Sequence, residues 1–263
     1  MDYETIKVEL RGAELRITLD RPDAMNAWNT QFGLDLRDAV ERAAIDDAVR
    51  AVVVTGAGRA FSSGADLKAG FDAGPDGVPD VMSALNDRYH PIIVGLRTMP
   101  KPVLAAVNGA AVGIGLSLAL AADLVIAKES AFFMLAFVNI GLVPDGGSSL
   151  FVPERVGFAR ATEMAMLGER VPARQALEWG LINRVTADDA LQDEANALAD
   201  RLSQGPTRSY AGTKRQLNAW QFARMEAQLE FEASIQSDLA ASRDFMEGVT
   251  AFVQKRPASF EGR

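Results

Sequence analysis

The sequence predicts an α/β protein whose first part alternates strands with helices and whose last third is helical. A period-2 hairpin pattern opens the chain, short continuous apolar runs then alternate with helical periodicity, and strand signals largely end after Pro153. Such alternation is typical of a mostly parallel sheet with crossover helices. We therefore expect an α/β core over residues 1–200 and a helical region over 201–263, which fold together because no flexible linker separates them.

The N-terminal elements follow from simple periodicity. Residues 6–10 and 15–19 alternate apolar and polar side chains around Gly12, which predicts a β-hairpin. Apolar residues at helical spacing predict an amphipathic helix over 30–47. The apolar run 51–54 stops at a glycine-rich stretch, as a buried strand of a parallel sheet does.

The middle of the chain repeats this order after an interruption. Residues 70–79 are rich in Gly, Asp and Pro, and we expect a mobile surface loop there. Beyond it the pattern predicts a helix over 80–98, a buried strand over 103–107, an apolar helix that follows Asn108-Gly109 and ends near 122, and short strands over 123–127 and 131–134.

The last third reads as helices joined by short turns. The predicted helices span 159–168, 173–179, 187–204, 207–219 and 222–255. The last of them carries an apolar face that includes Leu229, Phe245 and Phe252. A neighbouring subunit would cover such a face as readily as the rest of the chain does.

Composition excludes several classes of function. The 263 residues contain no cysteine, which excludes thiolate nucleophiles, disulfide frameworks and cysteine-ligated metals, and a single histidine, His90. We therefore expect no metal site. With 27 basic and 35 acidic residues, the net charge of −8 argues against nucleic acid or an anionic membrane as a partner. No signal peptide or transmembrane stretch is evident, so we expect a cytoplasmic protein.

Two glycine-bearing loops, residues 61–67 and 108–115, follow predicted buried strands. Each can direct free backbone N–H groups outward, and the second lies at a helix N-terminus, so the pair predicts an oxyanion hole. The alternatives are tight turns that require glycine, or a dinucleotide loop at Gly109–Gly115 in an oxidoreductase. A serine-hydrolase Gly-x-Ser-x-Gly motif is absent.

Several motifs, in order along nearly the whole chain, resemble the enoyl-CoA hydratase/isomerase (crotonase) superfamily. They are residues 19–22 (LDRP), 61–68 (FSSGADLK), 101–109 (KPVLAAVNG), 141–147 (GLVPDGG) and 248–256 (GVTAFVQKR). Within the superfamily, residues 136–145 are most similar to the isomerases of aerobic phenylacetate breakdown. The resemblance implies a crotonase-like spiral of ββα repeats with a C-terminal helical trimerisation region, and therefore a homotrimer or hexamer.

The resemblance also implies an acyl-CoA thioester substrate, with no cofactor beyond the coenzyme A of the substrate itself. The backbone N–H groups of Ala65 and Ile114 would stabilise the enolate oxygen. Hydratases of the superfamily use two glutamates, and the corresponding positions here are Ser117 and Phe137. A carboxylate is present instead at Asp145, where superfamily isomerases carry an acid. Alternatively, Asp145 is a turn residue before Gly146-Gly147.

The predicted site therefore has catalytic and substrate-binding parts. The catalytic residues are Asp145, Ala65 and Ile114. The substrate-binding residues are Ser63, Gly64, Asp66, Leu67, Gly113, Ser117, Phe137 and Lys255. Further basic candidates for the coenzyme A phosphates are Lys68, Arg21 and Lys101, while Asp66 is equally a loop-shaping residue. His90 is either a histidine of the surface or core or a residue facing the acyl pocket.

These residues favour an acyl-CoA isomerase that shifts a double bond, or rearranges a ring-derived acyl group, because one carboxylate suffices to move a proton between two carbons. Two alternatives remain within the resemblance: an enoyl-CoA hydratase with a substituted site, and an inactive acyl-CoA-binding protein. Neither acyl chain length nor the position of the double bond follows from the sequence.

Overall fold

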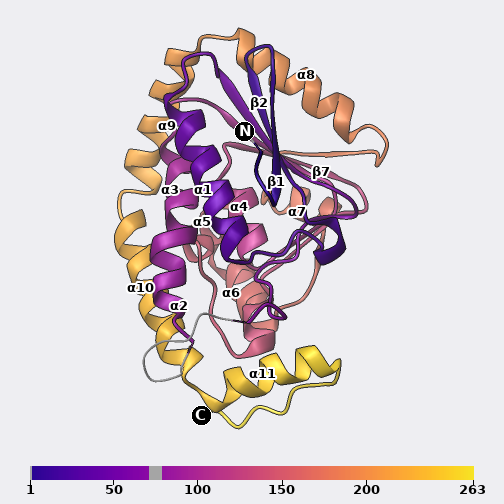
Figure 1. Cartoon of the computed structure of the whole chain (residues 1–263), viewed down its shortest axis with the longest axis vertical. Helices are drawn as coiled ribbons and strands as arrows, with labels where there is room; N and C mark the ends of the chain where they lie inside the picture. The colour runs from indigo at the N-terminus through magenta and orange to yellow at the C-terminus, as the bar shows by residue number, and fades with distance from the viewer. Residues whose placement is uncertain (1, 71–78) are drawn as a thin grey trace.

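Two β-sheets form the frame of the protein (Figure 1). The computed structural model describes residues 2–70 and 79–263, so the predicted loop over 70–79 lies almost wholly outside the described residues. The six-stranded sheet contains, in spatial order, β1 (Ile6–Arg11), β2 (Glu14–Leu19), β3 (Ala51–Gly56), β5 (Val103–Val107), β7 (Leu124–Lys128) and β10 (Arg184–Thr186). The four-stranded sheet contains β4 (Ala60–Ser62), β6 (Ala110–Val112), β8 (Phe132–Met134) and β9 (Val171–Pro172).

The chain alternates between the two sheets. Strands β3, β5 and β7 belong to the large sheet, and each is followed at once by a strand of the small sheet, β4, β6 or β8. Successive strands of each set pair in parallel, and helical segments connect one pair with the next. The architecture is therefore a spiral of ββα turns, and the predicted α/β fold class is confirmed.

Helices cover both faces of the large sheet (Figure 1). On one face, α8 (Leu191–Gln204) packs its apolar side chains against Val53, Leu104 and Ile126. Neighbouring strand residues such as Val52 belong to the main core instead, because successive side chains of a strand point to opposite faces. The main core also holds the apolar faces of α1 (Thr30–Ile45), α3 (His90–Thr98) and α4 (Ile114–Ala121).

Local structure departs from the periodicity pattern in the middle of the chain. The helix predicted over 80–98 consists of α2 (Val81–Ala84), a π-helical turn (Leu85–Tyr89) and α3. The apolar helix predicted after Asn108 begins only at Ile114, because Ala110–Val112 pairs with strands on both sides as β6. Sheet pairing thus overrides the helical propensity of a small-residue segment.

The helical last third needs three corrections. The helix α5 (Ser148–Val156) was not predicted, since Pro153 lies inside it. Short strands β9 and β10 interrupt the series formed by α6 (Phe158–Leu167), α7 (Ala173–Glu178) and α8. The single helix predicted over 222–255 is wrong: α10 (Met225–Ala240) ends before Ser242, whose hydroxyl accepts a hydrogen bond from Phe245 N (3.0 Å) and caps α11 (Arg243–Gln254).

A buried charge network attaches the helical last third to the core. On α9 (Thr207–Gln221), Lys214 Nζ lies 2.9 Å from Asp123 Oδ2, and Arg97 Nη2 lies 2.6 Å from Asp123 Oδ1. Asp123 Oδ2 also accepts a hydrogen bond from Val103 N at the start of β5 (2.8 Å). One carboxylate therefore joins α3, α9 and the large sheet.

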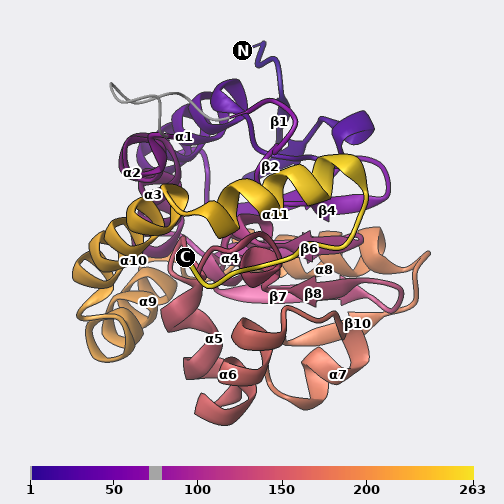
Figure 2. The same ribbon diagram turned by 90° about the horizontal axis from the view of Figure 1, so that it is seen from below.

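The remaining helix, α11, runs across the lower end of the molecule (Figures 1 and 2). It contacts the 3₁₀ segment Ala136–Ile140. It still exposes Met246, Phe252 and Val253 to solvent, each by at least half of its surface. Within the described part of the chain, no helix has the length and apolarity needed to cross a membrane.

Candidate active site

The small sheet brings the two predicted glycine loops together. Strands β4 and β6 pair in parallel, so the segments that leave their carboxyl ends start side by side. A Cβ added at Gly64 would lie 3.0 Å from Val112 O and 3.9 Å from Gly113 Cα. Gly64 has φ +93° and Gly113 has φ +54°, values that favour glycine. The absence of side chains thus permits the close approach of the two loops.

Both loops present an unpaired N–H donor. Trp28 N donates to Gly64 O (2.8 Å) and Asp66 N donates to Trp28 O (2.9 Å). In this parallel bridge the N–H of the intervening Ala65 points away from Trp28. Ile114 is the first residue of α4, where an N–H has no acceptor within the helix and the helix dipole favours negative charge. Across residues 2–70 and 79–263, no hydrogen bond uses either N–H.

Polar side chains of the N-terminal segment fix the first loop. Arg21 pairs with Asp66 (3.0 Å) and also donates to Ala27 O. Asn26 Nδ2 donates to Ala60 O (2.9 Å), and Asn26 O accepts from Ser62 Oγ (2.9 Å). Arg21 and Asp66 therefore shape the loop that carries Ala65. Sequence reasoning assigned no role to Asn26. This residue is buried and has a positive φ of 55°.

Asp145 lies in the turn that leads into α5, directly beside the first turn of α4. Its carbonyl oxygen accepts hydrogen bonds from Ser117 Oγ (2.7 Å) and Ser148 Oγ (2.8 Å). A Cβ on the next residue, Gly146, would collide with Ile114 Cδ1 and lie 3.1 Å from Ser117 Cβ. The turn is thus packed against the residue whose N–H is the second predicted donor.

The carboxyl group of Asp145 is buried, with 6% of the residue exposed. Its Oδ2 accepts a hydrogen bond from Gln236 Nε2 on α10 (2.7 Å), and its Oδ1 has no hydrogen-bond partner among the described residues. Burial, together with the nearby carboxyl group of Glu232, raises the pKa of Asp145 to about 8. A carboxyl group that titrates near neutral pH can both accept and return a proton.

Glu232 is the second buried acid of this region. It accepts hydrogen bonds from Gly147 N (2.8 Å) and Ser149 N (3.1 Å), at the N-terminus of α5. Burial raises the pKa of Glu232 to about 7. Its oxygens are engaged by backbone donors, so Asp145 is the acid with an oxygen left free.

Other side chains fill the two positions at which the resemblance implies glutamates in a hydratase. Ser117 is fully buried and its hydroxyl donates to the Asp145 carbonyl, which gives it a role in shaping the turn. The Phe137 ring is an apolar wall over the second loop, since a Cβ on Gly113 would lie 3.8 Å from Phe137 Cζ. Neither side chain is a carboxylate that could activate water.

The basic candidates fall into two groups. Lys101 is buried and its Nζ donates to the carbonyl oxygens of Ala43 and Asp46 (2.6 Å each), so it serves the core rather than a phosphate. Lys68 follows the first loop and is exposed, as is Lys255 at the end of α11. Among the three lysines, only these two have side chains open to a solvent-borne anion.

His90 lies in the core, as one of its two predicted placements required. Only 7% of the residue is exposed, and burial lowers the pKa of its imidazole to about 4. Its Nε2 has no hydrogen-bond partner within the described ranges. The histidine is therefore neutral at physiological pH.

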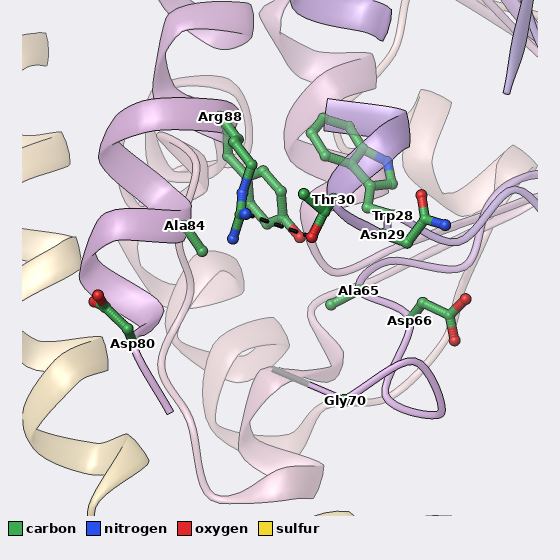
Figure 3. A pocket seen from close by; sticks show the side chains of 10 residues that line it. Trp28, Asn29, Thr30, Ala65, Asp66, Gly70, Asp80, Ala84 and Arg88 are labelled. Atoms are coloured by element: carbon green, nitrogen blue, oxygen red, sulfur yellow. Dashed lines mark hydrogen bonds between the residues drawn. The ribbon is translucent and has the colours of Figure 1, made fainter. Parts of the chain in front are cut away.

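A pocket of about 370 Å³, counting its open mouth, adjoins Ala65 (Figure 3). The pocket brings together the first loop, the start of α1 and the π-helical turn. Its lining includes Trp28, Thr30, Ala65, Asp66, Asp80, Arg88 and Tyr89. The Trp28 and Tyr89 rings meet edge to face with centroids 4.9 Å apart. The wall is therefore partly aromatic and partly polar. In the described residues, no group of three or more His, Asp or Glu side chains is arranged to hold a metal ion.

Comparison with known proteins agrees with this geometry. The model of the enoyl-CoA hydratase/isomerase family matches residues 11–263, and the chain belongs to that family. A crystal structure of an enoyl-CoA hydratase from Mycobacterium avium subsp. paratuberculosis superposes with a TM-score of 0.89 at 39% identity, covering 99% of this chain and 100% of that one. The crotonase fold predicted from the motifs is thereby confirmed.

Sequence relatives carry both kinds of activity in their names. A probable enoyl-CoA hydratase of Rhodobacter capsulatus is 44% identical over the full length of both chains. The 1,2-epoxyphenylacetyl-CoA isomerase of Escherichia coli is 38% identical over 99% of each chain. The trans-2-decenoyl-[acyl-carrier-protein] isomerase of Streptococcus mutans is 32% identical over the full length of both. The chain is an enzyme of this family, and its own residues bear on the choice between the two reactions.

Proposed function

We propose that the protein is an acyl-CoA isomerase that shifts a double bond through an enolate held by two backbone amides. One observation carries the proposal. The turn that carries Asp145, a buried carboxyl group with a free oxygen, packs against Ile114, the residue of the second N–H donor, while Ser117 and Phe137 occupy the positions of the hydratase glutamates. The names of the Escherichia coli and Streptococcus mutans relatives support the same choice.

The chemistry needs one group that takes a proton and later returns it. Asp145 would accept a proton from the α-carbon of a 3-enoyl thioester, so that the C–H electron pair forms a dienolate with the thioester carbonyl and the neighbouring double bond. The N–H groups of Ala65 and Ile114 would donate to the enolate oxygen, a contribution worth about 3 kcal/mol per donor in such sites. The same carboxyl group would then protonate a different carbon, which moves the double bond without net gain or loss of atoms.

We further propose that the acyl group is polar or derived from a ring rather than a long alkyl chain. The pocket beside Ala65 is lined by Trp28, Tyr89, Asp80 and Arg88, which suit a flat or polar group better than an alkyl tail. The coenzyme A moiety would bring its phosphates to exposed lysines such as Lys68 and Lys255. The ring-derived substrate named for the Escherichia coli relative supports this class of acyl group.

A homotrimer or hexamer is also part of the proposal, as is a cytoplasmic location. Large apolar side chains remain exposed on α6 and on the C-terminal helices, including Phe158, Phe231, Trp220 and Phe252. Exposed apolar side chains that form a contiguous patch are typical of subunit contacts. Light scattering coupled to gel filtration measures the mass, and a monomer at micromolar concentration would reject the assembly.

The direct test compares two reactions on one preparation. Conversion of a 3-enoyl-CoA to the conjugated 2-enoyl-CoA is followed by ultraviolet absorbance, in parallel with hydration of crotonyl-CoA. We expect isomerisation without hydration, and loss of the isomerisation in Asp145→Asn. Hydration without isomerisation would favour the second candidate, a hydratase with a substituted site, which the name of the Rhodobacter capsulatus relative supports.

A lack of turnover with a linear enoyl-CoA is interpreted only after a ring-derived acyl-CoA has been tested as well. If neither a 3-enoyl-CoA nor a ring-derived acyl-CoA turns over while coenzyme A esters raise the melting temperature, the protein is an acyl-CoA binder. A melting temperature that responds to NAD(H) or NADP(H) instead would identify the oxidoreductase alternative.

A further inference from the structure

One face of α10 carries a polar stripe that turns toward the protein interior, with two of its three residues buried. Gln228, Glu232 and Gln236 are spaced by four residues, so they lie on the same side of the helix. Glu232 and Gln236 are at most 2% exposed. Buried polar side chains are retained only where they are hydrogen-bonded, and these three bond to the turn between Val143 and Ser149.

Gln236 is the side chain that grips the catalytic candidate. Its Nε2 donates to Asp145 Oδ2 (2.7 Å) and to Val143 O (2.8 Å), so both hydrogens of the amide are used within the Asp145 turn. This pair of bonds fixes the carboxyl plane and leaves Oδ1 free. Gln236 Oε1 has no partner among the described residues, so the side chain is oriented by its donors alone.

Glu232, one turn earlier, acts on the other side of the same turn. Its two oxygens accept from Gly147 N and Ser149 N, which flank the start of α5. The carboxyl group therefore caps α5 from a different helix and fixes the glycine pair in its left-handed conformation, with φ values of +59° at Gly146 and +81° at Gly147. It also places a second acid near Asp145.

We propose that Gln236 and Glu232 of α10 are positioning residues for Asp145, with Gln236 orienting its carboxyl group and Glu232 fixing the turn that carries it. The inference rests on the proposed isomerase function, because it treats Asp145 as the proton carrier. The two residues are expected to act on the proton affinity of Asp145 in opposite directions. Gln236 donates to the ionised carboxylate and favours it, whereas the charge of Glu232 opposes it.

Few charged groups surround the Asp145 carboxyl group. The helix α4 contains no titratable residue, and the first six residues of α5 contain none. On α10, Glu232 is the titratable residue that acts on Asp145. A shift in the titration of Asp145 after substitution on α10 can therefore be assigned to the substituted residue.

The experiment measures kcat/KM for the isomerisation against pH in three variants. Gln236→Met keeps the side-chain volume and removes the donor, and we expect kcat to fall ~10–100-fold with little change in KM. The acidic limb of the pH profile of kcat/KM should move up by about 1 pH unit. In Glu232→Gln, the limb should move down by about 1 pH unit. Gln228→Leu is the matched control, because Gln228 lies on the same face and donates to Ser149 Oγ (2.9 Å), not to Asp145. In this variant the acidic limb of the pH profile should not move.

A second readout does not depend on turnover. The carboxyl absorption of Asp145 is obtained as the infrared difference between each protein and its Asp145→Asn counterpart, and its titration midpoint is measured. Opposite shifts in the two variants without any isomerase activity would reject the proposed function and retain the positioning role. Unmoved midpoints in both variants, with only a lower melting temperature, would show that the α10 stripe is packing alone and would overturn the inference.

Discussion

The two halves of the candidate site differ in the kind of group that each uses, because one consists of backbone amides and the other of a side-chain carboxyl group. The amide donors of Ala65 and Ile114 belong to the backbone, and the parallel pairing of β4 with β6 places them. The acid belongs to a side chain, and its environment comes from α10, some 90 residues further along the chain, through the Gln236 bond (2.7 Å, 91 residues apart). Backbone donors do not titrate, whereas a buried carboxyl group does. The comparison indicates that pH and C-terminal substitutions act on the acid and spare the donors.

The largest expected effect breaks the acid half alone. Asp145→Asn keeps the volume and the backbone bonds of the turn but cannot accept a proton, so kcat should fall ~10²–10⁴-fold while substrate affinity is retained. The isomerisation rate is measured by ultraviolet absorbance, and substrate affinity is measured by calorimetry with a non-reactive thioether analogue. Activity within tenfold of the wild type would remove Asp145 from the mechanism.

The next effect breaks the donor half alone. Ile114 is the first residue of α4, a position that tolerates proline, so Ile114→Pro removes one N–H with little cost to the helix. We expect kcat/KM to fall ~10²–10³-fold, with the pH dependence unchanged. Ile114→Val keeps the N–H and is the control. Equal losses in both variants would mean that the side chain matters and the donor does not.

A smaller effect tests how the C-terminal helices are attached. Asp123→Asn leaves Arg97 and Lys214, which are 6% and 5% exposed, without their carboxylate. The free energy of unfolding should fall by about 2 kcal/mol, less than for a fully buried pair because Asp123 keeps some exposure. Chemical denaturation measures it. Glu129→Gln, which loses only the exposed pair with Arg174, should change it by less than about 1 kcal/mol.

The last prediction concerns how stability depends on pH. The folded-state pKa of Asp145 is about 8 and the unfolded value is about 4, so between these values the folded chain binds the extra proton. The contribution of Asp145 to stability therefore falls as the pH rises from 4 to 8. At pH 9 the melting temperature of Asp145→Asn should exceed that of the wild type, by about 2–4 °C for each kcal/mol that ionisation of the buried carboxyl group costs. At pH 4 the two melting temperatures should be nearly the same. If the difference in melting temperature between the variant and the wild type is equal at both pH values, ionisation of the buried Asp145 carboxyl group does not cost stability.

The amount that sequence reasoning could predict follows the same division. The glycine loops lie next to strands whose apolar runs are local patterns, so the chain itself indicated the two loops as a pair, and the family resemblance assigned Ala65 and Ile114 as the donors within them. Gln236 and Glu232 gave no such signal, because their partners lie 83 to 93 residues away and the packing of α10 decides which turn they face. The only trace was their spacing of four within a predicted apolar helix. The break at Ser242 was missed for a related reason, since the apolar pattern continues through the N-cap.

The origin of the Asp145 partner in α10 has a consequence for the order of events during synthesis. A nascent chain emerges from the ribosome N-terminus first, and the ββα turns with both amide donors are complete well before residue 236 is added. Until then the Asp145 turn lacks its glutamine clamp and the cap of Glu232. The protein would therefore gain its two amide donors before the clamp of its proton carrier, and a chain that ends before residue 236 would carry Asp145 without the hydrogen bond that orients it.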